Sequence, residues 1–591
     1  HTGNYHDGKQ SLADMDKLIG KGYSPIVADD IISEPYAKGR KFTSRPDDPY
    51  NKVTIESLSG DLQLFDGRMN HNNGWFVLRS NIKPGVTKGA VKWIITPNVV
   101  ADWMYQPVIQ TSQIGYHPAQ DKEAVIEMDI RDNRKETAQI IRIDADGEKV
   151  VKNVTPANWG KFLRYNYLKV DFTDVKEAGL YKIKYDTSVS PIFRIDNDVY
   201  ARGVWQPVLE YFLPVQMCHM RVNEKYRVWH DCCHMDDAQM APAHNHIDGY
   251  DQKEGLSKFK PGEVVPGVNI GGWHDAGDFD LRIESQAGES YILALAYEAF
   301  HPNLDVTSID QINRVTEIHQ PDGKNDLLQQ VENGALTVVN GYLALGRLYR
   351  GIICNDLRQY VLLGDAAAMT DGKIGNEEDR WIFTEDNPGR ELSTAAQLAA
   401  VSRVLKGFND TLSVHCLDIA RKVYASTGNG NNRALFPKVQ AAVELYLTTG
   451  EQPYMDFILD NKELIIKQIG RIGWYTARVE KLFAQMKNKK AKAFSAAFRK
   501  ALTGYEQELN KQVQETPYGV PYRPNIWGAG WDIQRFGFQH YFLTTAYPEI
   551  FPKAPVFNAL NFILGCHPGS NQASFASGVG AQSATVGIEY R

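Results

Sequence analysis

The chain has 591 residues, of which 43% are hydrophobic and 23% are charged, and its net charge at pH 7 is −6. This composition is typical of a folded protein of about two to four domains and excludes a mainly disordered chain. The weak negative charge gives no reason to expect nucleic acid as a partner. No apolar run approaches the ~18–20 residues that span a bilayer, so we expect no transmembrane segment.

The first 200 residues predict β structure. Short runs rich in β-branched and aromatic residues alternate with turn signals, the clearest being 53–55, 75–78, 90–95, 124–128, 140–143 and 179–183. Strands of this length and spacing are typical of β-sandwiches. There is room for two, with a proline-bearing joint at about 103–107. We therefore expect a β-rich region at 1–104 and a β-sandwich at 105–196.

After residue 200 the hydrophobic period becomes that of helices. Apolar residues recur at i, i+3, i+4 and i+7 in 286–300, 326–348, 393–407, 412–424, 437–449 and 455–468. Repeated helices of this length predict a large all-α domain at 197–591. The stretches at 218–275, 365–392 and 514–536 exceed ordinary connections, and loops of that length in a helical domain are usually functional.

The strongest local motif is Gly271-Gly272-Trp273-His274-Asp275-Ala276-Gly277-Asp278. Its two carboxylates, three residues apart among glycines, can converge on one water molecule if the turn is tight. Hydrolysis of an acetal needs such a carboxylate base on one side and a carboxylic acid on the other. Taken alone, the motif fits better as an Asp/Gly-rich turn before a helix, with Asp278 or Asp280 as the N-cap.

This motif resembles the Asp-Ala-Gly-Asp signature of glycoside hydrolase family 9. Four other regions of the chain resemble the same family and occur in the same order along the sequence: 108–118 (VIQTSQIGYHP), 326–331 (DLLQQV), 517–530 (PYGVPY and IWGAG) and 560–565 (LNFILG). The first of them resembles the opening strand of the immunoglobulin-like domain that precedes many of these catalytic modules. The sequence is thus similar to cellulases and endo-β-1,4-glucanases of this family.

The resemblance implies a multidomain fold in which an N-terminal β-sandwich region, including an immunoglobulin-like domain, precedes an (α/α)6 barrel with an open cleft. It implies that Asp278 is the general base of an inverting mechanism and that Asp275 helps to hold the attacking water. In an inverting enzyme the acid and base lie ~6.5–9.5 Å apart, which leaves room for that water.

The same resemblance suggests side chains that contact the sugar. Trp273, Tyr522, Trp527 and Trp531 are candidate platforms, because the C–H faces of a pyranose pack well on aromatic rings, and we assign His274 to the same substrate site. The alternative for each aromatic side chain is packing in the core or in the cleft wall.

A second cluster of cysteines and histidines lies between residues 218 and 246. A zinc site needs four nitrogen or sulfur ligands in a tetrahedron, which thiolates and imidazoles supply. By resemblance the ligands of a structural zinc are Cys218, Cys233, His234 and a later histidine, for which we prefer His246. Cys232 is an additional thiol that makes the assignment ambiguous. A disulfide and unligated cysteines are the alternatives.

Calcium is common in the family, but no calcium site can be placed in this sequence. The segments 377–379 (EED) and 385–386 (ED) offer oxygen ligands without a defined loop spacing. A solvated acidic surface is the simpler interpretation of both.

The general acid of the family is a Glu well beyond the segment that matches Gly578-Val579-Gly580. Only eleven residues follow Gly580, and Glu589 comes too soon after the glycines to be assigned. We therefore expect a barrel that lacks its C-terminal end, with the general-acid Glu not identifiable in this chain.

We expect an inverting glycoside hydrolase that cleaves internal β-1,4-glucosidic bonds of cellulose, mixed-linkage glucan or xyloglucan. The alternatives are a glucan-binding protein that has lost the general acid, and an exo-acting β-glycosidase of the same fold. The chain begins His1-Thr2-Gly3-Asn4, without the basic and apolar regions of a signal peptide. We expect a monomer that is secreted, periplasmic or at the cell surface, its signal peptide having been removed.

Overall fold

The structure is a computed structural model, and it describes residues 35, 37–48, 50–66, 76–243, 250, 252–275, 279–354, 370–375, 379–428, 432–525 and 528–583. The chain divides into two compact units. The first comprises residues 1–104 with 244–251, and the second comprises residues 105–243 with 252–591. Each unit is described by itself.

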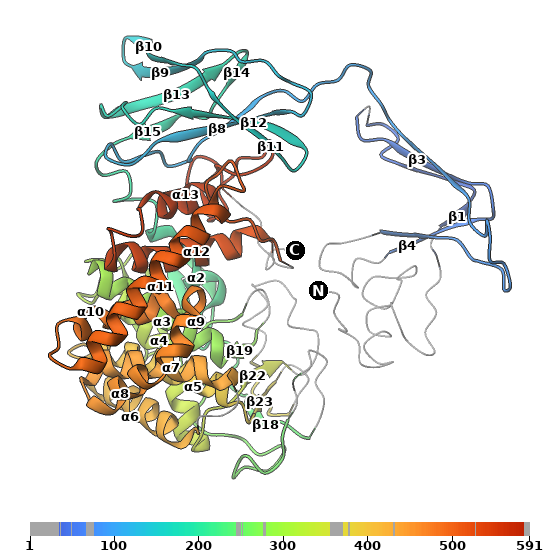
Figure 1. Cartoon of the computed structure of the whole chain (residues 1–591). Coiled ribbons are helices and arrows are strands. Elements are labelled where there is room, and N and C mark those ends of the chain that lie inside the picture. The colour runs from blue at the N-terminus through green and yellow to red at the C-terminus, as the bar shows by residue number, and fades with distance from the viewer. Residues whose placement is uncertain are drawn as a thin grey trace. The chain divides into compact units, whose positions relative to one another are not determined.

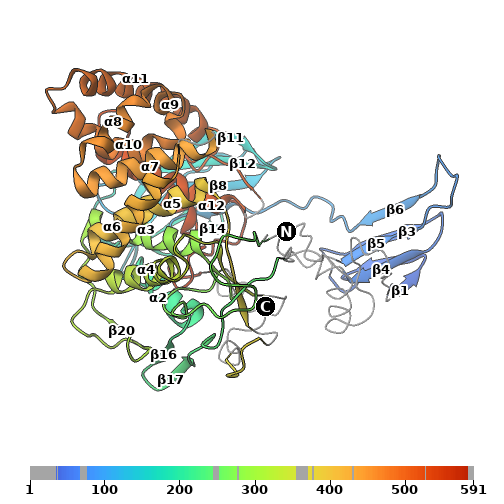
Figure 2. The same cartoon turned by 90° about the horizontal axis from the view of Figure 1, so that it is seen from below.

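The described residues of the first unit form six short antiparallel strands. They are β1 (Ala37–Gly39), β2 (Lys41–Ser44), β3 (Val53–Ser57), β4 (Leu62–Asp66), β5 (Phe76–Arg79) and β6 (Trp93–Pro97). They form two three-stranded sheets with the orders β1-β4-β5 and β2-β3-β6 (Figure 2). Few of their apolar side chains are buried: Leu62 and Phe65 are, while Ile94 and Ile95 are exposed.

The second unit begins with a two-sheet β domain. Its strands are β7 (Val108–Gln110), β8 (Glu123–Asp129), β9 (Ala138–Asp144), β10 (Gly147–Val154), β11 (Ala157–Phe162), β12 (Tyr165–Asp171), β13 (Gly179–Tyr185), β14 (Ser188–Val189) and β15 (Phe193–Ile195). One sheet has the order β11-β12-β8-β7, and the other has β10-β9-β13-β14 with β15 paired to β13. Alternating residues such as Ile126, Met128, Leu168 and Ile183 fill the core between them. The β-sandwich expected for this stretch is present.

Helices dominate the rest of the second unit. They are α2 (Gln206–Gln216), α3 (Ile283–Phe300), α4 (Asp326–Leu345), α5 (Pro388–Leu405), α6 (Asp410–Ser426), α7 (Asn432–Thr449), α8 (Gln452–Asp460), α9 (Lys462–Lys467), α10 (Ile469–Ala484), α11 (Lys489–Val513), α12 (Ala529–Ala546) and α13 (Ala554–Ile563). One continuous apolar core joins α3 through α12. Five of the predicted helices match α3 to α7, and the sixth is divided at Asn461 into α8 and α9. No described helix is long and apolar enough to cross a membrane.

The helical domain is not purely α, which corrects the sequence prediction. Its long connections carry β16 (Arg221–Glu224), β17 (Arg227–His230), β18 (Gln239–Met240), β19 (Leu281–Arg282), β20 (Thr307–Asp310), β21 (Val315–Ile318), β22 (Gly351–Cys354) and β23 (Arg380–Phe383). These strands form two four-stranded sheets, β17-β16-β21-β20 and β18-β23-β22-β19. Figure 2 shows the β16–β17 hairpin beside α2. Each strand has only two to four residues, and several pair with distant segments, such as β16 with β21 and β18 with β23, so they leave no clear local period in the sequence.

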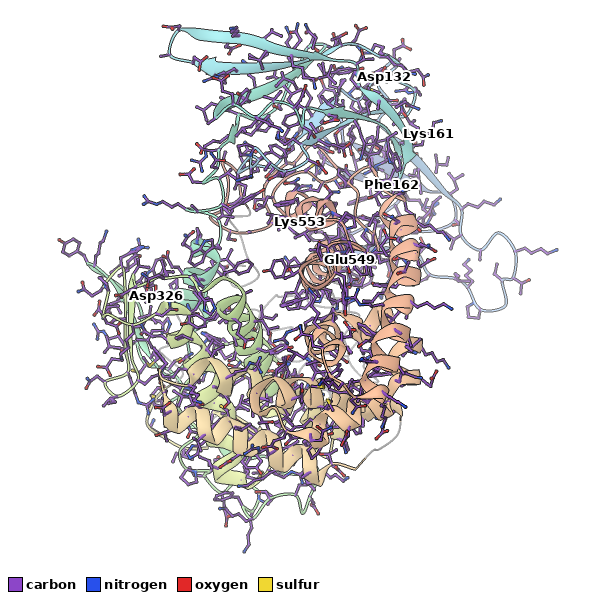
Figure 3. All side chains as sticks on the ribbon, turned by 60° about the vertical axis from the view of Figure 1, so that its left-hand side comes forward. Asp132, Lys161, Phe162, Asp326, Glu549 and Lys553 are labelled. Atoms are coloured by element: carbon purple, nitrogen blue, oxygen red, sulfur yellow. The ribbon has the colours of Figure 1, made fainter. Side chains whose placement is uncertain are left out.

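The β-sandwich packs directly on the helical domain. A buried apolar cluster joins Val125 and Tyr167 of the sandwich to Tyr518, Ile533 and Phe562 of the helical part. Figure 1 shows α12 and α13 beneath the sandwich, and Figure 3 shows the side chain of Phe162 at the edge that faces the helices. The two domains therefore share a core.

Polar contacts reinforce this interface. Glu127 on β8 is fully buried and accepts hydrogen bonds from the Tyr167 hydroxyl at 2.7 Å and from the Gly569 N–H at 3.2 Å. The N–H of Gln113 donates to the Leu564 carbonyl at 2.7 Å. The sandwich thus holds the segment that follows α13.

Candidate active site and metal cluster

The signature loop, residues 271–280, packs against α4 at two glycines that no other residue could replace without strain. Gly271 has φ +69° and Gly272 has φ +91°. A Cβ at Gly271 would lie 2.3 Å from the carbonyl oxygen of Asn333, and one at Gly272 would lie 2.6 Å from the hydroxyl of Thr337. Because both neighbours belong to α4, the glycines fix the loop closely against that helix.

Trp273 and His274 follow and point into the protein. Trp273 is 2% exposed, and its main chain exchanges two 2.8 Å hydrogen bonds with the side-chain amide of Gln286 on α3. His274 is 4% exposed. A ring as buried as that of Trp273 has no open face for a sugar, so the structure supports the packing alternative for this residue.

Asp275 is partly exposed, whereas the four loop residues before it are buried. Its N–H donates to the Asp280 carbonyl at 3.0 Å, which closes the loop on itself. Arg282 forms an ion pair with its Oδ2 at 3.3 Å, and the Ser285 hydroxyl donates to the same oxygen at 3.3 Å. Burial raises the pKa of the Asp275 carboxyl, while Arg282 and Ser285 oppose that shift. Asp278 lies outside the described residues.

A second carboxyl, Glu289, belongs to the same site. It follows Ser285 by four residues on α3, so both side chains lie on one face of the helix. Burial, with a smaller contribution from the charge of Asp275, raises the pKa of Glu289 to about 8. Glu289 was not identified from the sequence. The only signal for it in the sequence is its position four residues after Ser285, whose hydroxyl contacts Asp275 in the folded protein.

The buried side of the loop meets the cysteines. Among the residues that the structure describes, one group has its potential ligand atoms close enough to hold a metal ion: Cys218, Cys233, His234 and His274, whose atoms lie within 4.8 Å of one another. The sulfur atoms of Cys218 and Cys233 are 3.8 Å apart. His234 Nδ1 lies 3.8 Å from Cys218 Sγ, and His274 Nε2 lies 3.7 Å from Cys233 Sγ.

These distances fit a tetrahedral metal site. Bonds of 2.3 Å to a central zinc place two sulfur atoms about 3.8 Å apart, whereas a disulfide needs about 2.05 Å. None of the six cysteines forms a disulfide. His234 is also held in the left-handed region at φ 54°, which is uncommon for a non-glycine residue and typical of a functional constraint.

Electrostatics favour the ligand forms of the four side chains. Burial lowers the pKa of His234 and of His274, so both imidazoles are neutral and have a free lone pair. Burial opposes ionisation of Cys218, but its hydrogen bond with Cys233 and the charge of Arg380 hold the pKa of this thiol well below its ordinary value. Both effects favour the thiolate form of Cys218, which is the form that binds a metal ion.

The remaining predicted ligands fall elsewhere. Cys232 points away from the cluster, with its sulfur 3.8 Å from the Arg314 carbonyl, which removes the ambiguity between the two neighbouring cysteines. His246 lies outside the described residues. His274, assigned to the substrate from the sequence, is the fourth member of the group. For calcium, Glu385 and Asp386 are ion-paired with Arg390 and Lys253 respectively.

The other predicted sugar platforms differ in exposure. Trp531, in the first turn of α12, is 62% exposed. The ring of Tyr522 is half-buried and contacts the edge of Phe162 on the β-sandwich at 5.3 Å between centroids. Trp527 and Glu589 lie outside the described residues. The structure thus leaves Trp531 as the described platform with an open ring.

The structure combines a β-sandwich and a helical domain that share a core, and it places a carboxylate-bearing loop beside a Cys/His cluster. Comparison with known protein families identifies the class of hydrolase that has this arrangement. The model of glycosyl hydrolase family 9 matches residues 208–586, and that of the cellulase N-terminal immunoglobulin-like domain matches residues 104–190. The chain belongs to glycosyl hydrolase family 9 and is a glycoside hydrolase with an immunoglobulin-like domain, as its resemblance predicted.

Individual relatives are distant. A xyloglucan-specific endo-β-1,4-glucanase from Bacteroides ovatus is 24% identical over 455 residues, which are 71% of this chain and 72% of the relative. The crystal structure of a metagenome-derived family 9 endoglucanase superimposes with a TM-score of 0.62 at 20% identity, covering 81% of this chain and 86% of that one.

A Zn-binding triple mutant of a family 9 endoglucanase gives a TM-score of 0.60 at 20% identity and covers 79% of this chain and 85% of its own. At these identities the two structural matches concern the fold.

Proposed function

We propose that this chain hydrolyses internal β-1,4-glucosidic bonds of a plant-type β-glucan with inversion of configuration. Membership of the family supports the reaction class. The xyloglucan specificity of the Bacteroides ovatus relative makes xyloglucan the first substrate to test, ahead of cellulose and mixed-linkage glucan. We also propose that the helices form an (α/α)6 barrel and that the protein acts outside the cytoplasm.

The observation that carries this proposal is the way Asp275 is held. Among the described residues, the ion pair from Arg282 and the hydrogen bond from Ser285 both reach Oδ2. Oδ1 is thereby left for a water molecule, while the bond from the Asp275 N–H to the Asp280 carbonyl holds the main chain at this residue. A carboxylate fixed in this way can orient an attacking water.

Asp278, three residues further along the signature loop, is then the general base that takes the proton from this water. The base must be ionised for this step, and the water attacks the anomeric carbon from the face opposite the leaving group. Burial raises the pKa of Glu289 to about 8, which favours its protonated form near neutral pH and so limits the negative charge near Asp275. Trp531 offers an open aromatic face to a sugar ring.

We propose that Cys218, Cys233, His234 and His274 hold a zinc ion. Four protein ligands leave no open coordination position, so this ion would stabilise structure and supply no reactive water. Its place is informative, because His274 immediately precedes Asp275. A ligand at that position ties the signature loop to the interior of the domain.

The catalytic proposal is tested in the full-length protein with xyloglucan oligosaccharides. Proton NMR should show the α-anomer first. Asp278→Asn should lower kcat at least ~10²–10⁴-fold, the usual contribution of a general base, with little change in melting temperature. Asp305→Asn is the matched control: its carboxylate caps an exposed turn at Asp322 and Gly323, and its rate should equal that of the parent. Retention of configuration, or a near-parental Asp278→Asn, contradicts the proposal.

The metal proposal has its own test. Purified protein should contain about one zinc per chain, and Cys233→Ser should lower both zinc content and melting temperature while the folded fraction keeps its chemistry. Cys232→Ser is the control, since its sulfur lies outside the cluster. A metal-free protein with a Cys218–Cys233 disulfide would refute the site.

Product analysis separates the exo-acting alternative. An endo-acting enzyme shortens a long soluble glucan rapidly and releases mixed oligosaccharides. Release of a single small product from chain ends would identify an exo-acting enzyme instead.

A further inference from the structure

Arg380, the first residue of β23, is a fully buried cation beside the metal cluster. Its Nε donates to Asp237 Oδ2 at 2.7 Å, which forms a buried ion pair. Burial opposes the charge, but Asp237 and Cys218 raise the pKa of Arg380 further above its ordinary value. A buried arginine pair is costly, so its remaining contacts are informative.

The other side-chain contacts of Arg380 are with the signature loop, with the cluster and with His219, which itself contacts the loop. Nη1 of Arg380 donates to the Phe279 carbonyl at 2.7 Å, at the end of the loop. Nη2 lies 3.5 Å from Cys218 Sγ and 3.2 Å from His219 Nε2. The planar guanidinium thus donates in three directions at once, which a lysine ammonium on a flexible stem does not reproduce.

His219 extends this network to the beginning of the loop. Since a guanidinium can only donate, His219 Nε2 accepts, and the ring proton lies on Nδ1. Nδ1 lies 2.9 Å from the Gly271 carbonyl and donates to it. One arginine therefore reaches both ends of the signature loop, Phe279 directly and Gly271 through His219.

The middle of the loop is held by the cluster itself. His274 belongs to the metal-binding group, and the ring of Phe279 packs against those of His274 and His234, at 4.9 Å and 5.1 Å between centroids. Asp275 and Asp278 lie between these fixed points.

We propose that Arg380 is a positioning residue: it joins the Cys218 ligand to both ends of the signature loop, so that metal binding and the placement of Asp275 are coupled. This inference rests on the proposed roles of the loop and the cluster. Residues that hydrogen-bond to metal ligands commonly change metal affinity by about 10–100-fold when they are replaced.

The variants must avoid leaving a buried charge without its partner. Arg380→Met alone would leave Asp237 unpaired and could prevent folding, so it is combined with Asp237→Asn. Asp237→Asn alone is the matched control: its amide oxygen still accepts from Arg380 Nε, and the guanidinium keeps Phe279, His219 and Cys218 as partners. Arg380→Lys is the second test variant, since it keeps the charge next to Asp237 without the three-way donation.

Two measurements on the full chain need no hydrolysis. The first is zinc affinity by chelator competition under reducing conditions, with the absorption bands of Co²⁺ as a probe of tetrahedral coordination by sulfur. The second is hydrogen exchange of peptides that contain the Asp275 amide, whose N–H bonds to the Asp280 carbonyl, with and without saturating Zn²⁺.

We expect zinc affinity to fall about 10–100-fold in the double variant and in Arg380→Lys, and to remain within about threefold in Asp237→Asn. Saturating zinc should slow exchange of the Asp275 amide at least tenfold in the parent and in Asp237→Asn. In the double variant and in Arg380→Lys it should slow exchange by less than about twofold.

Parental affinity together with parental zinc-dependent protection in Arg380→Lys and in the double variant would overturn the coupling, and so would a parent that binds neither Zn²⁺ nor Co²⁺. Neither measurement depends on catalysis. An Asp278→Asn variant that keeps its activity would therefore refute the proposed function without affecting this result.

Discussion

The two β-rich regions of the chain have similar strand patterns in the sequence but bury their side chains differently. Strands β1 to β6 leave large apolar residues such as Phe76 and Ile95 exposed. The β-sandwich buries a core of its own and contributes Val125 and Tyr167 to a second core shared with the helical domain. A strand pattern in the sequence therefore predicts only local structure. Whether a β region stabilises a neighbouring domain depends on the apolar side chains that it buries against that domain.

Deletion should show this contrast most strongly. Removal of residues 1–104 leaves the second compact unit intact, so its melting temperature should change by no more than about 3 °C. Removal of residues 1–196 exposes the apolar cluster around Phe562 and Ile533, so the product should be insoluble or unfolded. Differential scanning calorimetry of the soluble fractions measures both. A soluble helical domain with the parental melting temperature would contradict the shared-core interpretation.

Glu127 should be the polar residue on which the interface depends most. Glu127→Ala leaves the hydroxyls of Tyr105 and Tyr167 and the N–H of Gly569 without their buried acceptor. The free energy of unfolding should fall by about 2–4 kcal/mol in urea titrations. Glu123→Ala on the same strand is the control: its ion pair with Lys169 is partly exposed, so its cost should stay below about 1 kcal/mol.

A pair of apolar truncations compares the two regions directly. Val125→Ala creates a cavity in the shared core and should cost about 1–3 kcal/mol of unfolding free energy. Ile95 on β6 is 60% exposed, so Ile95→Ala should change stability by less than about 0.5 kcal/mol. Equal costs for the two variants would mean that β6 has a buried partner.

The smallest expected effect is a pH dependence at Asp129 in the β-sandwich. Hydrogen bonds from the Arg131 side chain and main chain and from the Tyr105 N–H lower the pKa of the Asp129 carboxyl. A lowered acid pKa stabilises the fold above the unfolded value of about 4, and this stabilisation is lost as the pH falls below it. Asp129→Asn should therefore lower the melting temperature at pH 7 and have progressively less effect toward pH 3. A difference independent of pH would exclude the carboxylate as its cause.

Much of the fold could be predicted because its signals are local. The period of 3.6 residues located α3 to α7, and the alternating strands located the β-sandwich. The small sheets of the helical domain could not be predicted in the same way. Strand β18 pairs with β23 about 140 residues later in the chain, at Gln239 and Trp381, and no local pattern encodes that partner.

The same distinction between local signals and long-range contacts applies to the residues of the candidate site. Cys218, Cys233 and His234 could be chosen as ligands because this part of the chain resembles family members with a structural zinc, and Asp275 stood out through its motif. Burial then decided between packing and binding for Trp273, whose neighbours come from α3 and α4. Glu289 had no motif, because its raised pKa comes from burial and from Asp275 nearby.

The sequence by itself determined the two periods of secondary structure, the glycine turn before Asp275 and the family resemblance, since each depends on residues adjacent in the chain. Tertiary structure alone decided that His274 lies in the candidate metal-binding group and that Arg380 reaches Cys218 and Phe279. The physical reason is that burial, charge and distance act between side chains in space. A ligand 40 residues away and an arginine more than 100 residues away become neighbours only when the helical domain folds around the loop.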